Sequence, residues 1–171
     1  VIDDKVCPKD CMKPCLEACK YNAVDLGMKP ETITLKVGAV VLATGWDPYD
    51  TKKLDILGEG KIQNVITNMM LERLASGDGP TGGKIIRPSD GKEVKNIAFV
   101  QCAGSRDENH LHYCSYICCL ASLKHAMYMR EQYPDSKIRI FYIDIRTPGL
   151  YENRFYWKIK DDPNVIFTKG K

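Results

Sequence analysis

The sequence predicts an α/β fold with a Rossmann-like parallel sheet, preceded by a cysteine-rich N-terminal segment. Three short apolar runs of strand length lie at 96–101, 137–143 and 165–168. Two stretches with apolar residues at helical steps, 115–133 and 151–160, lie between them. This alternation of strands and helices with short connections is typical of a parallel sheet with right-handed crossovers.

The composition is that of an ordinary globular protein. The chain has 171 residues, 44% of them hydrophobic and 27% charged, and a net charge of +3. That charge is too small to indicate a nucleic-acid-binding protein. The longest apolar run, Val37–Leu42, is far shorter than the roughly 18 residues that span a bilayer. Because the chain begins with Val1 and lacks a signal peptide, we expect a piece of a longer protein.

The eight cysteines fall into two sets of four. The first set is Cys7, Cys11, Cys15 and Cys19, and the second is Cys102, Cys114, Cys118 and Cys119. Disulfides are typical of small secreted proteins. The long helical and strand patterns of this chain are not typical of such proteins. We therefore interpret the two sets as metal ligands in a reducing compartment.

The first set has the spacing C-x3-C-x3-C-x3-C. Bacterial ferredoxins bind their clusters with the tighter C-x2-C-x2-C followed by a further Cys-Pro. Here Lys20 stands where that proline usually follows, although the stretch 19–24 still resembles the end of a ferredoxin half-motif. An iron–sulfur cluster is favoured, and two alternatives stay open. One is a zinc site, and the other is an amphipathic helix whose cysteines share a face.

The stretch 32–46 alternates and then becomes continuously apolar, which predicts a strand or hairpin leading into a buried strand. That strand ends in Ala43-Thr44-Gly45, similar to the strand-end motif with which two-dinucleotide-domain flavoproteins approach FAD. The alternative is a core strand followed by a glycine turn.

After this strand, the stretch 64–76 predicts a short helix capped by Thr67 or Asn68. The glycine-rich run 77–84 lacks the spacing of a phosphate loop and predicts a surface turn.

The second cysteine set lies where ligand sites gather in parallel sheets. Cys102 ends the first strand of the sheet, Cys114 precedes the helix, and Cys118 and Cys119 fall in its first turn. Adjacent helical residues point about 100° apart, so both reach one bulky cluster only if the helix start is distorted. A cubane is large enough for such an arrangement, whereas a single zinc ion tolerates adjacent ligands less well. The helix N-terminus favours thiolates. Gly104 is the only glycine in the loop after the first strand, whereas a dinucleotide site needs several. NAD(P)H binding is therefore not expected.

Charged residues near this set allow two interpretations each. Arg106 either raises the reduction potential of a cluster or is a surface residue paired with Asp107 or Glu108. His110 and His112 are expected to face solvent, and His125 is expected on the helix surface.

Longer stretches resemble a known family. QCAGSRD, YCSYICC, EQYPDSKIRIFYIDIRTPG and YENRFYWKIKDD resemble the middle of the A subunits of heterodisulfide reductases. The A subunits of the quinone-interacting membrane-bound oxidoreductase complex of sulfate reducers look especially similar. The resemblance covers nearly all of 37–171.

The resemblance implies a thioredoxin-reductase-like FAD protein with an unusual [4Fe-4S] cluster near the flavin. Its ligands would be Cys102, Cys114, Cys118 and Cys119. Ala43, Thr44 and Gly45 would lie beside FAD in a partial flavin site, because the first dinucleotide fingerprint of the family is absent. We thus expect a ferredoxin-like segment at 1–31, part of an FAD-binding domain and linker at 32–95, and a Rossmann-like unit at 96–171.

The implied function is electron transfer by an oxidoreductase subunit. Electrons would pass between FAD, [4Fe-4S] clusters and partner subunits, linking a membrane quinone pool to adenylylsulfate reductase or to a heterodisulfide reductase-type partner. The resemblance implies a cytoplasmic protein held at the inner membrane by its partners. Two other functions stay open: a zinc-stapled interaction module, and a thiol–disulfide redox protein that uses Cys118 and Cys119.

Overall fold

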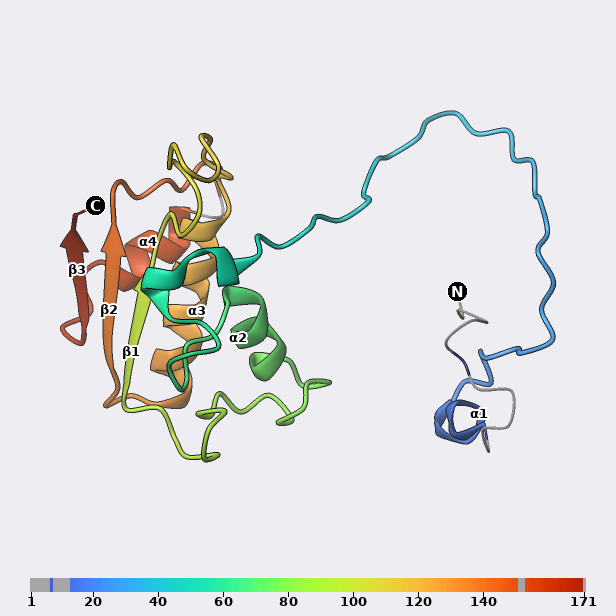
Figure 1. Ribbon diagram of the computed structural model, residues 1–171, viewed down its shortest axis with the longest axis horizontal. Helices are drawn as coiled ribbons and strands as arrows, with labels where there is room; N and C mark the ends of the chain where they lie inside the picture. Colours follow the sequence, from blue (N-terminus) through green and yellow to red (C-terminus); the bar gives the residue numbers. More distant parts are fainter. Residues whose placement is uncertain (1–6, 8–12, 151–152, 171) are drawn as a thin grey trace. The chain divides into compact units, whose positions relative to one another are not determined.

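The computed structural model describes residues 7, 13–150 and 153–170. The chain divides into two compact units, one that ends at Gly45 and one that begins at Trp46 (Figure 1). The second unit contains all strands of the described residues, together with helices α2, α3 and α4.

The larger unit is an α/β unit with a three-stranded parallel sheet, as predicted. Its strands are β1 (Asn96–Val100), β2 (Lys137–Tyr142) and β3 (Val165–Lys169), in the order β1-β2-β3. Helix α3 (Cys118–Gln132) connects the first two strands and α4 (Asn153–Ile159) the last two. All strands run the same way (Figure 1), so loops that leave their carboxyl ends share one edge of the sheet. This architecture is consistent with a Rossmann-like fold.

The core lies between one face of the sheet and α3. Ile138 and Ile140 of β2 are completely or almost completely buried, as are Leu123 and Met129 of α3. These side chains belong to one apolar cluster that also includes Phe99 of β1. Burial of such side chains contributes about 1.5–3 kcal/mol each. This cluster therefore holds the sheet edge and the start of α3 in a fixed relation.

The other face of the sheet is exposed in the part of the chain described. β2 alternates strictly, and its residues Arg139 and Phe141 face away from the core. Val100 of β1 and Ile166 of β3 are about half exposed. Parallel sheets are usually covered on both faces. This pattern leaves an apolar face without a covering layer.

Helix α2 (Asn68–Ala75) packs on α3. Because of this packing, the prediction for His125 was wrong. Thr67 is its N-cap, as predicted, with its side-chain oxygen accepting a hydrogen bond from the Met70 N–H at 3.2 Å. His125, expected on the surface of α3, is 1% exposed. The prediction was wrong because α2 covers that side of α3, where His125 Nε2 and Glu72 Oε2 are 2.6 Å apart.

The smaller unit corrects a second prediction. Its helix α1 (Pro14–Ala18) is a single turn that begins with a proline. The predicted buried strand before Gly45 is not formed: residues 39–45 have no regular secondary structure, and Val41 and Leu42 are more than 80% exposed. A strand needs a neighbour to satisfy its backbone groups, and none of the described strands pairs with this stretch.

Among the described residues, no helix combines the length and apolar character needed to cross a bilayer.

Candidate functional site

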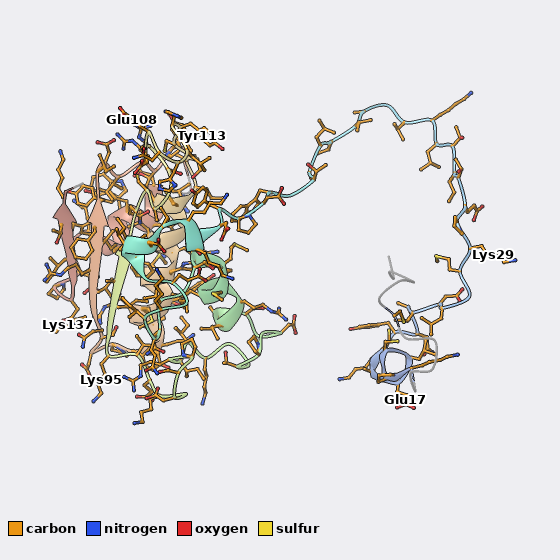
Figure 2. The ribbon with its side chains drawn as sticks, in the orientation of Figure 1. Glu17, Lys29, Lys95, Glu108, Tyr113 and Lys137 are labelled. Atoms are coloured by element: carbon orange, nitrogen blue, oxygen red, sulfur yellow. The ribbon has the colours of Figure 1, made fainter. Side chains whose placement is uncertain are left out.

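The second cysteine set lies at the carboxyl edge of the parallel sheet. The loop that leaves β1 carries Cys102 and Cys114 and rises beyond the tips of the strands (Figure 1). Figure 2 shows Glu108 and Tyr113 of this loop at that edge, and Lys95 and Lys137 at the opposite end of β1 and β2. The site thus occupies the position where open parallel sheets bind ligands, as the sequence predicted.

Backbone hydrogen bonds fold this loop back on itself. The Ser105 N–H donates to the Cys102 carbonyl at 3.1 Å, and the Leu111 N–H donates to the Gly104 carbonyl at 3.0 Å. Three residues other than glycine, Cys102, Arg106 and Tyr116, have φ between 56° and 59°. Such left-handed conformations are unfavourable for these residue types and concentrate at functional sites. The fold therefore holds the cysteine loop in a costly conformation.

Tyr49 anchors the loop from a distant part of the sequence. Its hydroxyl lies 2.6 Å from His110 Nδ1. A side chain at Gly104 would place its Cβ 2.8 Å from the Tyr49 ring, so this close approach requires glycine, which also has φ 77°. His110 is consequently half buried, contrary to the prediction, whereas His112 is exposed as predicted.

Cys118 and Cys119 are the first two residues of α3, which begins three residues later than predicted. A hydrogen bond from Cys119 lowers the pKa of Cys118 to about 5. The same hydrogen bond, together with burial, raises the pKa of Cys119. Near neutral pH the pair thus carries one proton, on Cys119. Both sulfurs lie close together at a helix N-terminus, where thiolates are stabilised.

Cys102 and Cys114 complete the set. Burial and the neighbouring thiolate of Cys118 raise the pKa of Cys102, and a smaller contribution in the same direction comes from Cys114. Cys102 thus lies within electrostatic range of the other three thiols. The described cysteines form no disulfide. Within those residues, no three His, Cys, Asp or Glu side chains have an arrangement that suits a single metal ion.

An ion-pair network from the neighbouring strand borders the cysteines. Arg106 donates a hydrogen bond of 2.7 Å to the Asp144 carboxylate, just beyond the carboxyl end of β2. Arg146 Nη2 lies 3.4 Å from the same oxygen. The Asp144 carbonyl oxygen is 3.6 Å from the sulfur of Cys119. Arg106 thus pairs with Asp144 rather than with Asp107 or Glu108.

Two observations test whether this site suits an iron–sulfur cluster. The first is the donor set, since four cysteine sulfurs, two in the loop after β1 and two at the start of α3, are the ligands that such clusters require. The second is Gln101, which precedes Cys102 and is 7% exposed. Neither its amide nitrogen nor its amide oxygen has a hydrogen-bond partner among the described residues. A buried polar group of this kind normally has a partner. The residues present fit the cluster.

The first cysteine set is described only in part. Cys11 lies outside the described residues, while Cys7, Cys15 and Cys19 lie in the smaller unit. The sulfur of Cys19 accepts a hydrogen bond from the Ala23 N–H at 3.3 Å, which lowers its pKa. Backbone N–H groups that face a thiolate also stabilise metal-bound sulfur. Whether this set binds a cluster stays a prediction.

The proposed flavin residues are also in the smaller unit. Ala43, Thr44 and Gly45 are exposed, and Gly45 has φ 79°, which glycine adopts without strain. Their role beside FAD stays a prediction.

Four cysteines at the carboxyl edge of a parallel sheet are typical of a cysteine-ligated metal or redox protein. The curated relatives agree with this class: over most of its length the chain is homologous to the A subunits of CoB-CoM heterodisulfide reductases. It is 43% identical to the A subunit of the ferredoxin:CoB-CoM heterodisulfide reductase of Methanosarcina mazei, over 92% of the chain and 20% of that protein. It is 41% identical to the A subunit of the H(2):CoB-CoM heterodisulfide,ferredoxin reductase of Methanothermobacter thermautotrophicus, over 95% and 25%.

A third relative names the cofactor class. The iron-sulfur A subunit of the CoB–CoM heterodisulfide reductase of Methanocaldococcus jannaschii is 41% identical over 92% of the chain and 24% of that protein. The chain spans about a fifth to a quarter of the length of these relatives. No protein-family model matches it. The iron–sulfur and oxidoreductase interpretations of the sequence are supported at this level.

Four residues near the cysteines were not predicted from the sequence: Gln101, Tyr49, Asp144 and Arg146. Asp144 and Arg146 follow the second predicted strand, so the rule that ligand sites gather at carboxyl ends of strands was a usable signal. Tyr49 carried no such signal because its contact depends on the path of the chain before α2. Gln101 looked like the last residue of a strand.

Proposed function

We propose that this chain is part of an electron-transferring iron–sulfur protein of the heterodisulfide reductase A-subunit type. The proposed ligands of its [4Fe-4S] cluster are Cys102, Cys114, Cys118 and Cys119. The observation that supports this most is the convergence of the four thiols at the carboxyl edge of the sheet, with Cys118 and Cys119 adjacent at the start of α3. The names of the relatives support the same class.

Finer parts of the proposal rest on the sequence resemblance. They include a thioredoxin-reductase-like fold, FAD beside Ala43, Thr44 and Gly45, and a second cluster at Cys7, Cys11, Cys15 and Cys19. The domain division at 1–31, 32–95 and 96–171 belongs to the same proposal. So do partner subunits that link a membrane quinone pool to adenylylsulfate reductase or a heterodisulfide reductase-type acceptor. We place the protein in the cytoplasm, at the inner membrane through these partners.

The chain's own residues would hold the cluster and control its surroundings. A bound [4Fe-4S] cluster supplies one-electron transfer. The Cys102 loop and the start of α3 provide the thiolates, and the N-terminus of α3 favours their negative charge. Tyr49 fixes the loop through His110 and Gly104. No residue is required as an acid or base, because the transfer of one electron breaks no covalent bond.

Anaerobic reconstitution with iron and sulfide tests this function. We expect brown protein with broad visible absorbance and about four iron atoms per occupied cysteine set. Cys118→Ser and Cys119→Ser should each reduce the iron bound at the second set, while Ser89→Ala, at an exposed position in the loop before β1, serves as the control. Protein that retains zinc alone, with no iron or sulfide, would contradict the proposal.

The pair Cys118 and Cys119 favours a second candidate, a thiol–disulfide redox protein. Cys118 is a thiolate near neutral pH with a thiol beside it, as a reactive pair requires. Replacing Cys102 and Cys114 by serine distinguishes the two functions. Disulfide exchange would survive those substitutions in part, whereas a four-cysteine cluster would be lost.

A further inference from the structure

Two arginines and one aspartate form a charged network beside the cysteine site. Arg106 lies in the cysteine loop, and Asp144 and Arg146 lie in the loop that leaves β2. Arg106 Nη1 is 2.7 Å and Arg146 Nη2 is 3.4 Å from one oxygen of Asp144. Arg146 also donates a hydrogen bond of 3.4 Å to the Tyr116 hydroxyl, and its guanidinium lies 5.4 Å from the centre of that ring.

Both arginines of the network act on the cysteines. Among the described residues the network contains two guanidinium groups and one carboxylate. Burial raises the pKa of Cys102, and the positive charge of Arg106 partly offsets this rise. Burial works against the charge of Arg146, but Cys114, Tyr116 and Asp144 raise its pKa. Each arginine thus interacts with a different cysteine of the set.

The backbone holds Arg106 in this position. Its φ is 56°, a conformation that only some residues other than glycine adopt. The Arg106 N–H donates to the Tyr113 carbonyl at 3.2 Å. Its side chain is 25% exposed, whereas a solvated surface arginine is usually far more open. Asp144 accordingly fixes a cation beside the cysteines instead of neutralising a remote surface charge.

We propose that Arg106 and Arg146, held by Asp144, raise the reduction potential of the cluster bound by Cys102, Cys114, Cys118 and Cys119. This inference rests on the proposed function. Reduction adds one electron to the cluster, supplied in the test by dithionite, and no bond is formed or broken. The reduced cluster carries one more negative charge, which a nearby cation stabilises more than it stabilises the oxidised cluster. In this role the arginines are positioning residues that act through the cluster.

A potentiometric titration of the reconstituted chain of 171 residues tests the proposal. Cys7, Cys11, Cys15 and Cys19 are replaced by serine so that only the second set is observed by EPR and visible absorbance. Arg106→Gln should make reduction about tenfold less favourable, which is a shift of about 59 mV to lower potential for one electron. Arg106→Lys keeps the charge and should shift the midpoint less than half as far. Arg146→Gln should shift it in the same direction as Arg106→Gln.

Arg87→Gln is the matched control. Arg87 also forms a salt bridge with an aspartate three residues away, Asp90, in a loop before β1. It lies toward the opposite end of that strand from the cysteine loop. Its substitution removes the same charge and should leave the midpoint unchanged.

The possible outcomes separate this inference from the function on which it rests. If the parent protein binds no cluster, the proposed function fails. If clusters form with normal iron content and the midpoints of Arg106→Gln and Arg146→Gln equal that of the parent, only the inference about the arginines is overturned. An equal shift in Arg87→Gln would also overturn it, because the effect would then be one of total charge. If Arg106→Gln does not assemble a cluster, the midpoint potential of Arg146→Gln decides whether the inference holds.

Discussion

At the scale of single residues, Gln101 of the larger unit has a buried side chain without hydrogen-bond partners among the described residues. Its carboxamide is buried next to Cys102, and both polar atoms lack partners in the described chain. Burial without hydrogen bonds costs about 1–3 kcal/mol for such a group. Gln132 offers a contrast: its amide donates to the Gly83 carbonyl at 2.8 Å and accepts from the Ile85 N–H at 2.9 Å.

We predict opposite effects of the same substitution at these two positions. In cluster-free protein, Gln101→Leu should leave the free energy of unfolding unchanged or raise it by about 1 kcal/mol, because a buried unpartnered amide is removed. Gln132→Leu should lower it by about 1–2 kcal/mol through the loss of two hydrogen bonds. Urea denaturation measures both. A loss at Gln101 as large as that at Gln132 would show that the Gln101 amide is already satisfied.

At the scale of elements, α2 and α3 are joined by a buried polar contact. Partial burial opposes ionisation of Glu72, but hydrogen bonds from Lys124 and His125 hold its pKa below the ordinary value. Burial lowers the pKa of His125, and Glu72 offsets this only in part. His125 is therefore neutral in the folded protein at a pH where the unfolded chain already takes up a proton.

This contact predicts a loss of stability in mild acid. The unfolded chain binds a proton at His125 below about pH 6.5 and the folded chain does so only at lower pH, so the free energy of unfolding falls as pH decreases through that window. The slope from this group is at most about 1.4 kcal/mol per pH unit. The pKa of Glu72 is also lowered in the folded protein, so protonation of Glu72 below about pH 4.5 decreases the free energy of unfolding further. Urea denaturation between pH 7.5 and about pH 5 measures this slope, and because the lowered pKa of Cys118 adds a slope of the same sign, the histidine is identified by the difference between the parent and a His125 variant.

His125→Gln should flatten this pH dependence, because a glutamine still donates to Glu72 but does not titrate. His112→Gln, at an exposed position in the cysteine loop, is the control and should keep the slope of the parent. An unchanged slope in His125→Gln would mean that His125 is not the group responsible.

The elements also show what sequence patterns can and cannot predict. The strand–helix alternation predicted β1, β2, β3 and the parallel sheet to within one or two residues at most ends, because apolar periodicity reports burial directly. The same reasoning failed for the apolar stretch before Gly45, since periodicity does not reveal whether a pairing strand is present. It also failed for His125, whose burial depends on the docking of α2 onto α3 rather than on its neighbours in sequence.

At the scale of the whole molecule, the site combines segments that are far apart in the chain. Tyr49 anchors the cysteine loop, the loop after β1 and the start of α3 supply the cysteines, and the loop after β2 supplies Asp144 and Arg146. The cysteines themselves were predictable from their spacing and from the place of Cys102 at a strand end. Their charged surroundings were not, because a contact across parallel strands leaves little trace in local sequence.

The central claim is that the second cysteine set binds a [4Fe-4S] cluster by itself. Its most direct test is iron and sulfide analysis, with EPR of the dithionite-reduced sample, on anaerobically reconstituted chain in which Cys7, Cys11, Cys15 and Cys19 are serine. We predict about four iron and four sulfide per chain and an EPR signal that appears on reduction. Less than one iron per chain, with all four remaining thiols free to react with an alkylating reagent, would contradict the claim.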